Sequence, residues 1–333
     1  MLEHGGRLRP AAARWGIPLA DWLDLSTGIN PRGWPVPPLP ADCWRRLPED
    51  DDGLAETAAA YYGNASLLPV AGSQAAIQSL PLLLPRAAVV MPAPLYAEHP
   101  FAWERASHKV RRLPGASLTR ALAAMAPNVL LCNPNNPTGR AYARDELLDA
   151  AAQLKKRGGT LIVDEAFADA DPDGCVAPFA GTAAAPNLIV LRSLGKFFGL
   201  AGARVGFVFA GGELLARLAE ALGPWALSGP ARAAAQGALA DRGWQAATRA
   251  RLIADGERLR ALLAPLAGDG LAGASPLFRW LPTERAQTLH DFLAARGILV
   301  RLFADVPGVR VGLPGDESEW QRLAAAIEEW RVK

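Results

Sequence analysis

The sequence predicts an α/β protein with a large domain, built on a mainly parallel seven-stranded sheet between helices, and a smaller α+β domain. Short apolar runs alternate with longer helical patterns between about residues 67 and 210, which is typical of parallel strands covered on both faces. The 333 residues are enough for two compact domains. Half of the residues are hydrophobic, enough to build a sizeable core.

The predicted elements of the large domain follow one another in a regular order. The strands are Leu67–Ala71, Ala87–Met91, Val110–Leu113, Asn128–Cys132, Thr160–Asp164, Leu188–Leu191 and Arg204–Phe209. The helical patterns are Gly53–Tyr62, Ser73–Leu84, Leu118–Met125, Asp145–Arg157 and Leu214–Leu222. Residues 17–40 are rich in proline, which favours an extended arm or an active-site loop over a helix.

The C-terminal part mixes strands with helices and so predicts the smaller domain. A long helical region, Ala231–Leu263, is expected to be interrupted near Asp241–Gly243. The strands Leu277–Leu281, Leu299–Phe303 and Val309–Leu313 and the helices Ala286–Arg296 and Glu317–Arg331 follow it. We therefore place the large domain at residues 36–222 and the small domain at residues 1–35 and 223–333.

Composition excludes several classes of function. The net charge of +2 gives no broad footprint for nucleic acid or an anionic membrane. Cys43, Cys132 and Cys175 are far apart and, like the histidines, lack metal-ligand spacing, so we expect neither disulfides nor a metal site. Because no apolar run approaches the ~18–20 residues of a membrane span, a cytoplasmic protein is expected.

The segment Ser193–Gly206 carries the strongest chemical signal. Lys196 follows an apolar strand in a loop flanked by apolar residues, where desolvation favours the neutral amine, a nucleophile for aldehydes. Ser193 and Arg204 offer a hydroxyl and a guanidinium to a phosphate. The alternative reading is a surface lysine beside a glycine-rich turn.

Other polar fragments also follow predicted strands. A carboxylate at a strand tip, such as Asp164, needs a cation, although an aspartate here could simply cap the next helix. Asn133–Gly139, which contains the sequence NPTG, is by itself a turn. Ala71–Gln74 joins a strand to a helix start that is an anion site or an ordinary cap. Tyr96 is either a stacking ring or a core residue.

In order and spacing these fragments resemble the pyridoxal-phosphate (PLP) enzymes of aminotransferase fold type I. The resemblance implies that Lys196 holds the cofactor aldehyde, that Asp164 pairs with the pyridine nitrogen, and that Asn136 hydrogen-bonds the phenolic oxygen. It places the cofactor phosphate and ring against Gly72, Ser73, Gln74, Ser193, Arg204 and Tyr96.

Four further fragments resemble one particular group of these enzymes. His4–Gly6, Leu25–Pro31, Pro48–Leu54 and Val311–Gly315 resemble the threonine-phosphate decarboxylases of cobalamin biosynthesis. Their reaction converts L-threonine O-3-phosphate to (R)-1-amino-2-propanol O-2-phosphate and carbon dioxide. The histidinol-phosphate aminotransferases share the fold and also take a phosphorylated amine.

A small-molecule substrate of this kind needs its own anion contacts. Arg310 is the candidate for the substrate carboxylate, because a guanidinium can bind it through two hydrogen bonds. We favour His4, Arg32 and Arg301 for the substrate phosphate. Gly28 and Asn136 complete the expected substrate site. Arg32 could equally be a solvated loop residue, and Arg310 an exposed strand arginine.

The sequence departs from the family pattern at two positions. Phe167 stands where the transaminase branch usually has a tyrosine, which leans away from transamination. Leu47 stands near the place of a tyrosine that relatives contribute from a partner subunit to the cofactor phosphate. Relatives are homodimers, so a homodimer is expected by analogy.

Three hypotheses remain at this point. The first is PLP-dependent decarboxylation of threonine phosphate, and the second is transamination of histidinol phosphate or a similar amine. The third is a PLP-binding scaffold or regulatory protein without turnover. Lys196, Asp164, Asn136 and Arg204 together argue against the third hypothesis.

Overall fold

The computed structural model of the chain describes residues 2–115, 117–267, 271, 273, 275–303 and 305–332. These residues form two compact units. The large unit comprises Gly33–Asn136 and Ala141–Ala246, and the small unit comprises Met1–Arg32, Pro137–Arg140 and Ala247–Lys333. Residues 1 and 333, the predicted ends of the small domain, lie outside the described residues.

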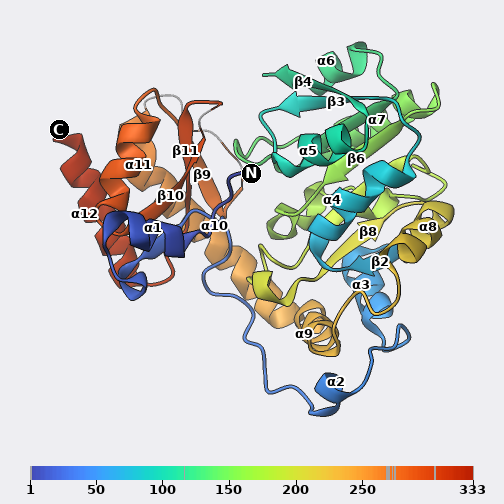
Figure 1. Cartoon of the computed structure of the whole chain (residues 1–333), viewed down its shortest axis with the longest axis horizontal. Helices are drawn as coiled ribbons and strands as arrows, with labels where there is room; N and C mark the ends of the chain where they lie inside the picture. Colours follow the sequence, from blue (N-terminus) through green and yellow to red (C-terminus); the bar gives the residue numbers. More distant parts are fainter. Residues whose placement is uncertain are drawn as a thin grey trace. The chain divides into compact units, whose positions relative to one another are not determined.

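A large sheet forms the centre of the large unit (Figure 1). Within the described residues it has seven strands in the order β2-β8-β7-β6-β5-β3-β4. Neighbouring strands are parallel except for β8, which is antiparallel to β7 and to β2. The strands are β2 (Leu67–Val70), β3 (Ala88–Ala93), β4 (Lys109–Pro114), β5 (Asn128–Cys132), β6 (Thr160–Asp164), β7 (Leu188–Ser193) and β8 (Gly206–Phe209).

The large unit also contains helices, several of which connect these strands and cover the two faces of the sheet. They are α2 (Asp42–Arg45), α3 (Leu54–Tyr62), α4 (Gly72–Leu83), α5 (Glu98–Arg105), α6 (Leu118–Ala123), α7 (Arg144–Lys155), α8 (Gly212–Leu222) and α9 (Gly229–Ala240). The helices α4, α5 and α8 pack on one face, where every second strand residue, such as Leu130, Ile162 and Ile189, enters a common core. The next residues along β6, Leu161 and Val163, are also fully buried, so both faces of the strand are covered.

The strand β4 lies at one edge of the large sheet and pairs with β3 alone among the described strands. Lys109, Arg111 and Arg112 are exposed along it, and Pro114 ends it. Cations and proline are residues that commonly protect an edge strand from pairing with another chain.

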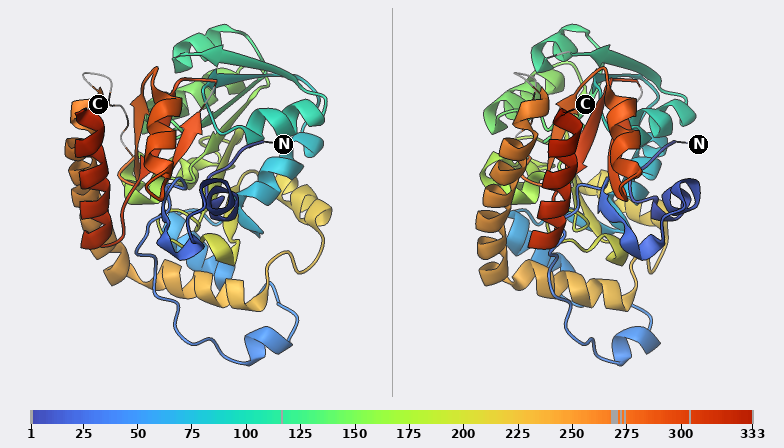
Figure 2. Two further views of the ribbon diagram at one scale, coloured as in Figure 1. Left: turned by 60° about the vertical axis from the view of Figure 1, so that its left-hand side comes forward. Right: turned by 90° about the vertical axis from the view of Figure 1, so that its left-hand side faces the viewer.

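The small unit contains a second sheet, which has four strands in the described part of the chain. Its order is β1 (Leu23–Leu25), β10 (Ile298–Phe303), β11 (Gly308–Gly312) and β9 (Phe278–Pro282). Only the β1–β10 pair of this order is parallel. The helices of the unit are α1 (Leu8–Trp15), α11 (Ala286–Ala294), α12 (Glu317–Arg331) and most of α10 (Arg242–Ala267). Figure 2 shows α11 and α12 beside the strands.

The predicted fold class is confirmed, and every predicted strand is present with ends shifted by at most two residues. The predicted helix interruption is also present, since α9 ends at Ala240 and α10 begins at Arg242. The sequence analysis did not identify α1, α5 or the strand β1 inside the proline-rich segment. Among the described residues, no helix combines the length and apolar character needed to cross a membrane.

The compact units divide the chain differently from the predicted domain boundaries. Residues 223–246 belong to the large unit, although they were predicted to begin the small domain. The reason is that α9 packs against α3 and carries Arg232, whose buried guanidinium binds both Asp52 carboxylate oxygens at 2.6 and 2.7 Å. The first boundary falls at residue 33 instead of 36.

Candidate active site

The predicted chemistry-bearing residues of the large unit gather at one edge of its sheet. Because β2, β3, β5, β6 and β7 run in the same direction, their carboxyl ends meet at this edge. The strand β8 runs the other way and begins there, with Gly206 paired to both Val70 and Ser193. Ligands of open α/β sheets bind at such an edge.

The central group of the site is a buried carboxylate–imidazole pair. Asp164 ends β6, and its Oδ2 lies 2.8 Å from Nε2 of His99 on α5. Its Oδ1 accepts a hydrogen bond from the backbone N–H of Ala166 at 3.0 Å. Both side chains are at most 6% exposed. The carboxylate is therefore held in one orientation, and a cation approaching it would be shielded from water.

His99 was missed by the sequence analysis. It follows Tyr96 by three residues, but nothing in the local pattern shows that α5 brings its ring back to the tip of β6. The pairing itself depends on how α5 packs against the sheet.

Cys132 completes a compact group with His99 and Asp164, whose possible ligand atoms all lie within 4.8 Å of one another. Cys132 and Asp164 are register partners on β5 and β6. A metal would need the thiolate, but burial, followed by the Asp164 carboxylate, raises the pKa of this thiol well above its ordinary value. This group is thus a buried thiol beside a histidine–carboxylate pair.

The start of α4 forms an anion cradle. Ala71 precedes the helix and has only a methyl side chain, so it cannot cap the N–H groups of the first turn, which includes Gly72, Ser73 and Gln74. The guanidinium of Arg204 lies beside this turn. It is so close to Gly72 that a Cβ built there would be 2.9 Å from Arg204 Nη2. Ser193 ends β7 at the same edge of the sheet.

Replacing Gly72 with alanine is expected to destabilise the protein by roughly 1–2 kcal/mol. Gly72 has a φ of +70°, a left-handed conformation that a side chain disfavours, and the added methyl group would also displace Arg204. Gly212→Ala is the matched control, because a Cβ there meets nothing within 4 Å. Denaturant unfolding measures both variants. Equal free energies of unfolding for the two would contradict the expectation.

The loop that carries Lys196 rests on aromatic side chains. Phe197 and Phe198 are fully buried and both contact the Trp244 ring, at centroid distances of 5.5 and 5.7 Å. Lys196 itself is partly buried, and its Nζ lies 5.2 Å from the centre of the Phe167 ring. The backbone of this loop is thus fixed while the amine points at an apolar wall beside the end of β6.

Two further predicted residues lie in loops that are joined to each other. Tyr96 follows β3, and Asn136 follows β5. Asn135 donates from Nδ2 to the carbonyl oxygen of Pro94 at 2.9 Å, which ties the two loops together. Burial raises the pKa of the Tyr96 phenol to about 12, so this phenol is neutral over the physiological range.

A buried ionic network lies behind the ends of β6 and β7, and the sequence analysis missed it. Arg192 donates from Nη1 to Glu165 at 2.9 Å and from Nη2 to Asp169 at 2.5 Å. All three side chains are at most 2% exposed. Because Glu165 follows Asp164 and Arg192 precedes Ser193, the network fixes two neighbouring strand ends of the site. Charged residues at the ends of apolar strands were its only sequence signal.

The predicted substrate residues of the small unit lie around one part of its sheet. Arg301 on β10 and Arg310 on β11 are direct register partners. Arg310 is 4% exposed and donates from Nη2 to the carbonyl oxygen of Ser26 at 2.6 Å. Arg301 donates to the carbonyl oxygen of Glu3 at 2.6 Å, next to His4. Gly28 is buried in the loop after β1.

Arg32 belongs to a different cluster of the small unit. Its Nη2 donates to Asp255 at 2.9 Å, and Asp255 also binds Arg251 at 3.1 Å. Asn30 accepts from Arg251 at 2.8 Å and from the backbone N–H of Arg32 at 3.1 Å. The side chain of Arg32, which was predicted to bind the substrate phosphate, therefore already has a carboxylate partner.

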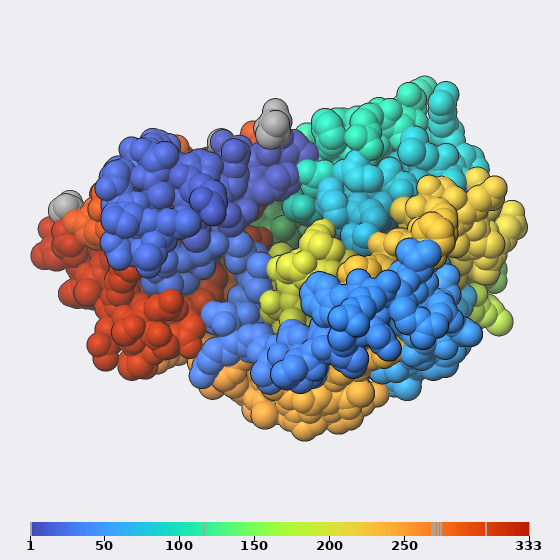
Figure 3. Space-filling view, turned by 60° about the horizontal axis from the view of Figure 1, so that its bottom comes forward, coloured from blue at the N-terminus to red at the C-terminus, as the bar shows by residue number. Residues whose placement is uncertain are grey.

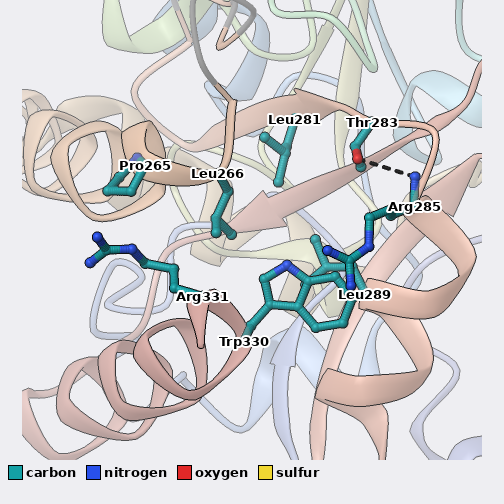
Figure 4. A pocket seen from close by; sticks show the side chains of 8 residues that line it. All are labelled: Pro265, Leu266, Leu281, Thr283, Arg285, Leu289, Trp330 and Arg331. Carbon is teal, nitrogen blue, oxygen red and sulfur yellow. Dashed lines mark hydrogen bonds between the residues drawn. The ribbon is translucent and has the colours of Figure 1, made fainter. Parts of the chain in front are cut away.

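A pocket of the small unit contains none of these residues. It is lined by Pro265, Leu266, Leu281, Thr283, Arg285, Leu289, Trp330 and Arg331 (Figure 4). The Arg285 guanidinium lies 4.3 Å from the centre of the Trp330 ring, and Thr283 accepts from the backbone N–H of Arg285 at 3.2 Å. This arrangement covers the aromatic ring, so we interpret the pocket as part of the packing of α11 and α12.

The family model for class I and II aminotransferases matches residues 48–327 of the chain. The chain belongs to this family. Two of its relatives are named threonine-phosphate decarboxylase. The one from Pseudomonas aeruginosa is 52% identical and is aligned over 98% of this chain and 97% of its own length. The one from Sinorhizobium sp. is 44% identical over the same shares of the two chains.

A solved structure of the family supports the fold assignment. The histidinol-phosphate aminotransferase from Sinorhizobium meliloti, solved in complex with pyridoxal-5'-phosphate, matches with a TM-score of 0.82 and 23% sequence identity. The match covers 99% of this chain and 95% of the aminotransferase. This likeness establishes that the chain has the aminotransferase fold.

Both departures from the aminotransferase pattern are visible in the structure. Phe167 is 5% exposed, and its ring faces Lys196 without offering a hydroxyl group. Leu47 is 64% exposed, in a segment that also exposes Val36 and Trp44. Figure 3 shows the surface of this blue segment beside the orange residues of α9, which α2 contacts.

Proposed function

We propose that the chain is a PLP-dependent threonine-phosphate decarboxylase of cobalamin biosynthesis. It converts L-threonine O-3-phosphate to (R)-1-amino-2-propanol O-2-phosphate and carbon dioxide. The observation that carries this proposal is the 52% identity with the Pseudomonas aeruginosa enzyme of that name, over nearly the full length of both chains. A second relative of the same name, at 44% identity, agrees with it.

The residues at the edge of the large sheet fit PLP. The uncapped start of α4 and Arg204 suit its phosphate, and Gly72 leaves the space that a Cβ would fill. The Asp164 carboxylate, oriented by His99, suits a protonated pyridine nitrogen. We assign Ser73, Gln74 and Ser193 to the phosphate, Tyr96 to the ring face and Asn136 to the phenolic oxygen. Bound PLP supplies an electron sink for the charge left on Cα when carbon dioxide departs.

The other roles fall to the side chains of the chain itself. Lys196 would hold the cofactor when no substrate is bound; once the substrate ammonium group has displaced it, the lysine would carry the protons of that group and would donate one to Cα in place of carbon dioxide. The apolar ring of Phe167 covers one side of the Lys196 amine and excludes water there.

The small unit supplies the substrate contacts in this proposal. Arg301 and Arg310 stand directly opposite each other on antiparallel strands, and the Glu3 carboxylate lies 3.5 Å from Nη1 of Arg301. Two neighbouring guanidinium groups suit an anionic substrate, because each can donate two hydrogen bonds to a carboxylate or phosphate. We assign Arg310 to the carboxylate, with Arg301 and His4 at the phosphate and Gly28 and Asn136 beside the substrate. Arg32 binds the phosphate only if its guanidinium releases Asp255.

Arg310→Lys is expected to raise the KM for threonine phosphate about tenfold to a hundredfold, with a smaller change in kcat. Lysine keeps the charge but cannot bind a carboxylate through two parallel hydrogen bonds. Steady-state kinetics measure the change, and Arg120→Lys, at an exposed arginine of α6, is the control. A KM equal to that of the control would remove Arg310 from the substrate site.

The reaction itself can be tested on the purified protein loaded with PLP. We expect release of carbon dioxide from L-threonine phosphate without any oxo-acid acceptor. The alternative is a histidinol-phosphate aminotransferase or a related PLP aminotransferase. Acceptor-dependent conversion of histidinol phosphate, with no carbon dioxide from threonine phosphate, would establish that alternative and overturn the proposal.

We also propose that the protein is a cytoplasmic homodimer. The exposed apolar side chains of Val36, Trp44 and Leu47 in one segment support a second copy as the partner. Light scattering after size-exclusion chromatography measures the mass directly. A monomer at micromolar concentration would contradict the dimer, and recovery in a fraction other than the cytoplasm would contradict the location.

A further inference from the structure

A chain of hydrogen bonds joins α5 to α4 and ends at Tyr96. Oε2 of Glu98, the first residue of α5, accepts from Nε2 of Gln74 at 2.8 Å and from Nε2 of Gln78 at 2.9 Å. Oε1 of Gln74 then accepts from the hydroxyl of Tyr96 at 3.4 Å. At the other end, Arg105 donates to Oε1 of Gln78 at 2.6 Å.

The chemistry of Glu98 decides which way both amides face. An ionised carboxylate can only accept hydrogen bonds, so each glutamine must turn its NH₂ group towards Glu98. The oxygen of Gln74 must then point away from Glu98, towards Tyr96. Arg105 reinforces this direction at Gln78, because a guanidinium can only donate.

The Tyr96 hydroxyl is a donor that matches the Gln74 oxygen. Its phenol keeps its proton over the physiological range because burial, then the Glu98 and Asp164 carboxylates, raise its pKa to about 12. A protonated phenol donates a hydrogen bond to the Gln74 oxygen, and a reversed amide would present a donor to it instead. Glu98 therefore contributes, through Gln74, to the direction of the Tyr96 hydroxyl.

We propose that Glu98 is a positioning residue, which acts through Gln74 to hold the Tyr96 ring against the bound coenzyme. This inference rests on the proposed function, because it takes Tyr96 as the residue on the coenzyme ring. Glu98 contacts neither coenzyme nor substrate in this proposal. Its effect reaches the reaction through the tyrosine hydroxyl.

A double-mutant cycle with Tyr96 tests the proposal in the PLP-loaded protein. Glu98→Leu removes the acceptor and is expected to raise the PLP dissociation constant about fivefold to tenfold, the range for losing a hydrogen bond. Glu98→Gln keeps an acceptor oxygen in place and should change the constant by less than about threefold. In the Tyr96→Phe background, which retains the ring but lacks the hydroxyl, Glu98→Leu should change it less than about twofold.

Glu104→Gln is the matched control, since Glu104 lies on the same helix and pairs with Arg112 at the surface. It should leave the constant unchanged. An equal loss from Glu98→Leu in both backgrounds would show a merely structural role and overturn the inference, as would no loss in either. If Glu98→Leu does not fold, Glu98→Ala, which also removes the acceptor, gives the same comparison in the two backgrounds.

The readout is PLP binding, so the test stays separate from the proposed reaction. Wild-type protein that binds PLP but releases no carbon dioxide from threonine phosphate would overturn the decarboxylase function and leave the cycle interpretable. Wild-type protein that binds no PLP would overturn both. The two failures are therefore distinguishable.

Discussion

Lys196→Ala is expected to lower the rate of carbon dioxide release from threonine phosphate by at least about a thousandfold. The variant loses the amine that holds the cofactor and donates a proton to Cα, and proton transfer by a positioned side chain alone contributes roughly 10²–10⁴-fold. The fold should persist, because the loop is held by Phe197 and Phe198 and not by the lysine. Single-turnover kinetics measure the rate.

Borohydride reduction followed by peptide mass spectrometry provides a second readout of the same variant. The wild-type peptide that contains Lys196 should gain the mass of reduced cofactor, and the variant should show no such adduct. Lys156→Ala, at an exposed lysine after α7, is the control and should behave like the wild type. A labelled lysine elsewhere in the wild type, or activity retained by Lys196→Ala, would refute the assignment.

Asp164→Asn is expected to reduce kcat roughly a hundredfold to a thousandfold. The substitution keeps the shape of the side chain but removes the charge opposite the pyridine nitrogen, and breaking a buried ion pair typically costs about 3–5 kcal/mol. An asparagine can still accept from Ala166 and donate to His99, so the loop should keep its place.

The absorbance of bound PLP and the kcat of Asp164→Asn should change together. Asp149→Asn, at an exposed carboxylate of α7, is the control and should affect neither. A kcat within about tenfold of the wild-type value would mean that the charge of Asp164 is not what keeps the cofactor effective.

The sequence was sufficient to predict elements whose pattern is local. The strands β5, β6 and β7 each contain at least three consecutive apolar residues (129–132, 161–163 and 188–191), so their strand character could be predicted without tertiary information. Asp164, Lys196 and Gly72 could be found for the same reason, because each directly follows or closes such a run. The direction of parallel strands then brings them to one edge.

The residues that the sequence analysis missed depend on packing. His99 reaches Asp164 only because α5 lies on the same face of the sheet as the Asp164 side chain. Arg192 meets Glu165 and Asp169 through strand register and a short turn after β6. The compact units divide the chain differently from the predicted domains near residue 223, because the bonds of Arg232 to Asp50 and Asp52 join segments 180 residues apart.

The cations along β4 also bear on the behaviour of concentrated solutions. A second molecule that tried to extend the large sheet at this edge would bring Lys109 and Arg111 close to the same cations of the first molecule, and the repulsion would oppose edge-to-edge pairing of the two sheets. Raising the ionic strength, or adding a polyanion, screens that repulsion. A buffer of low ionic strength should therefore keep the concentrated protein in solution better than a buffer of high ionic strength.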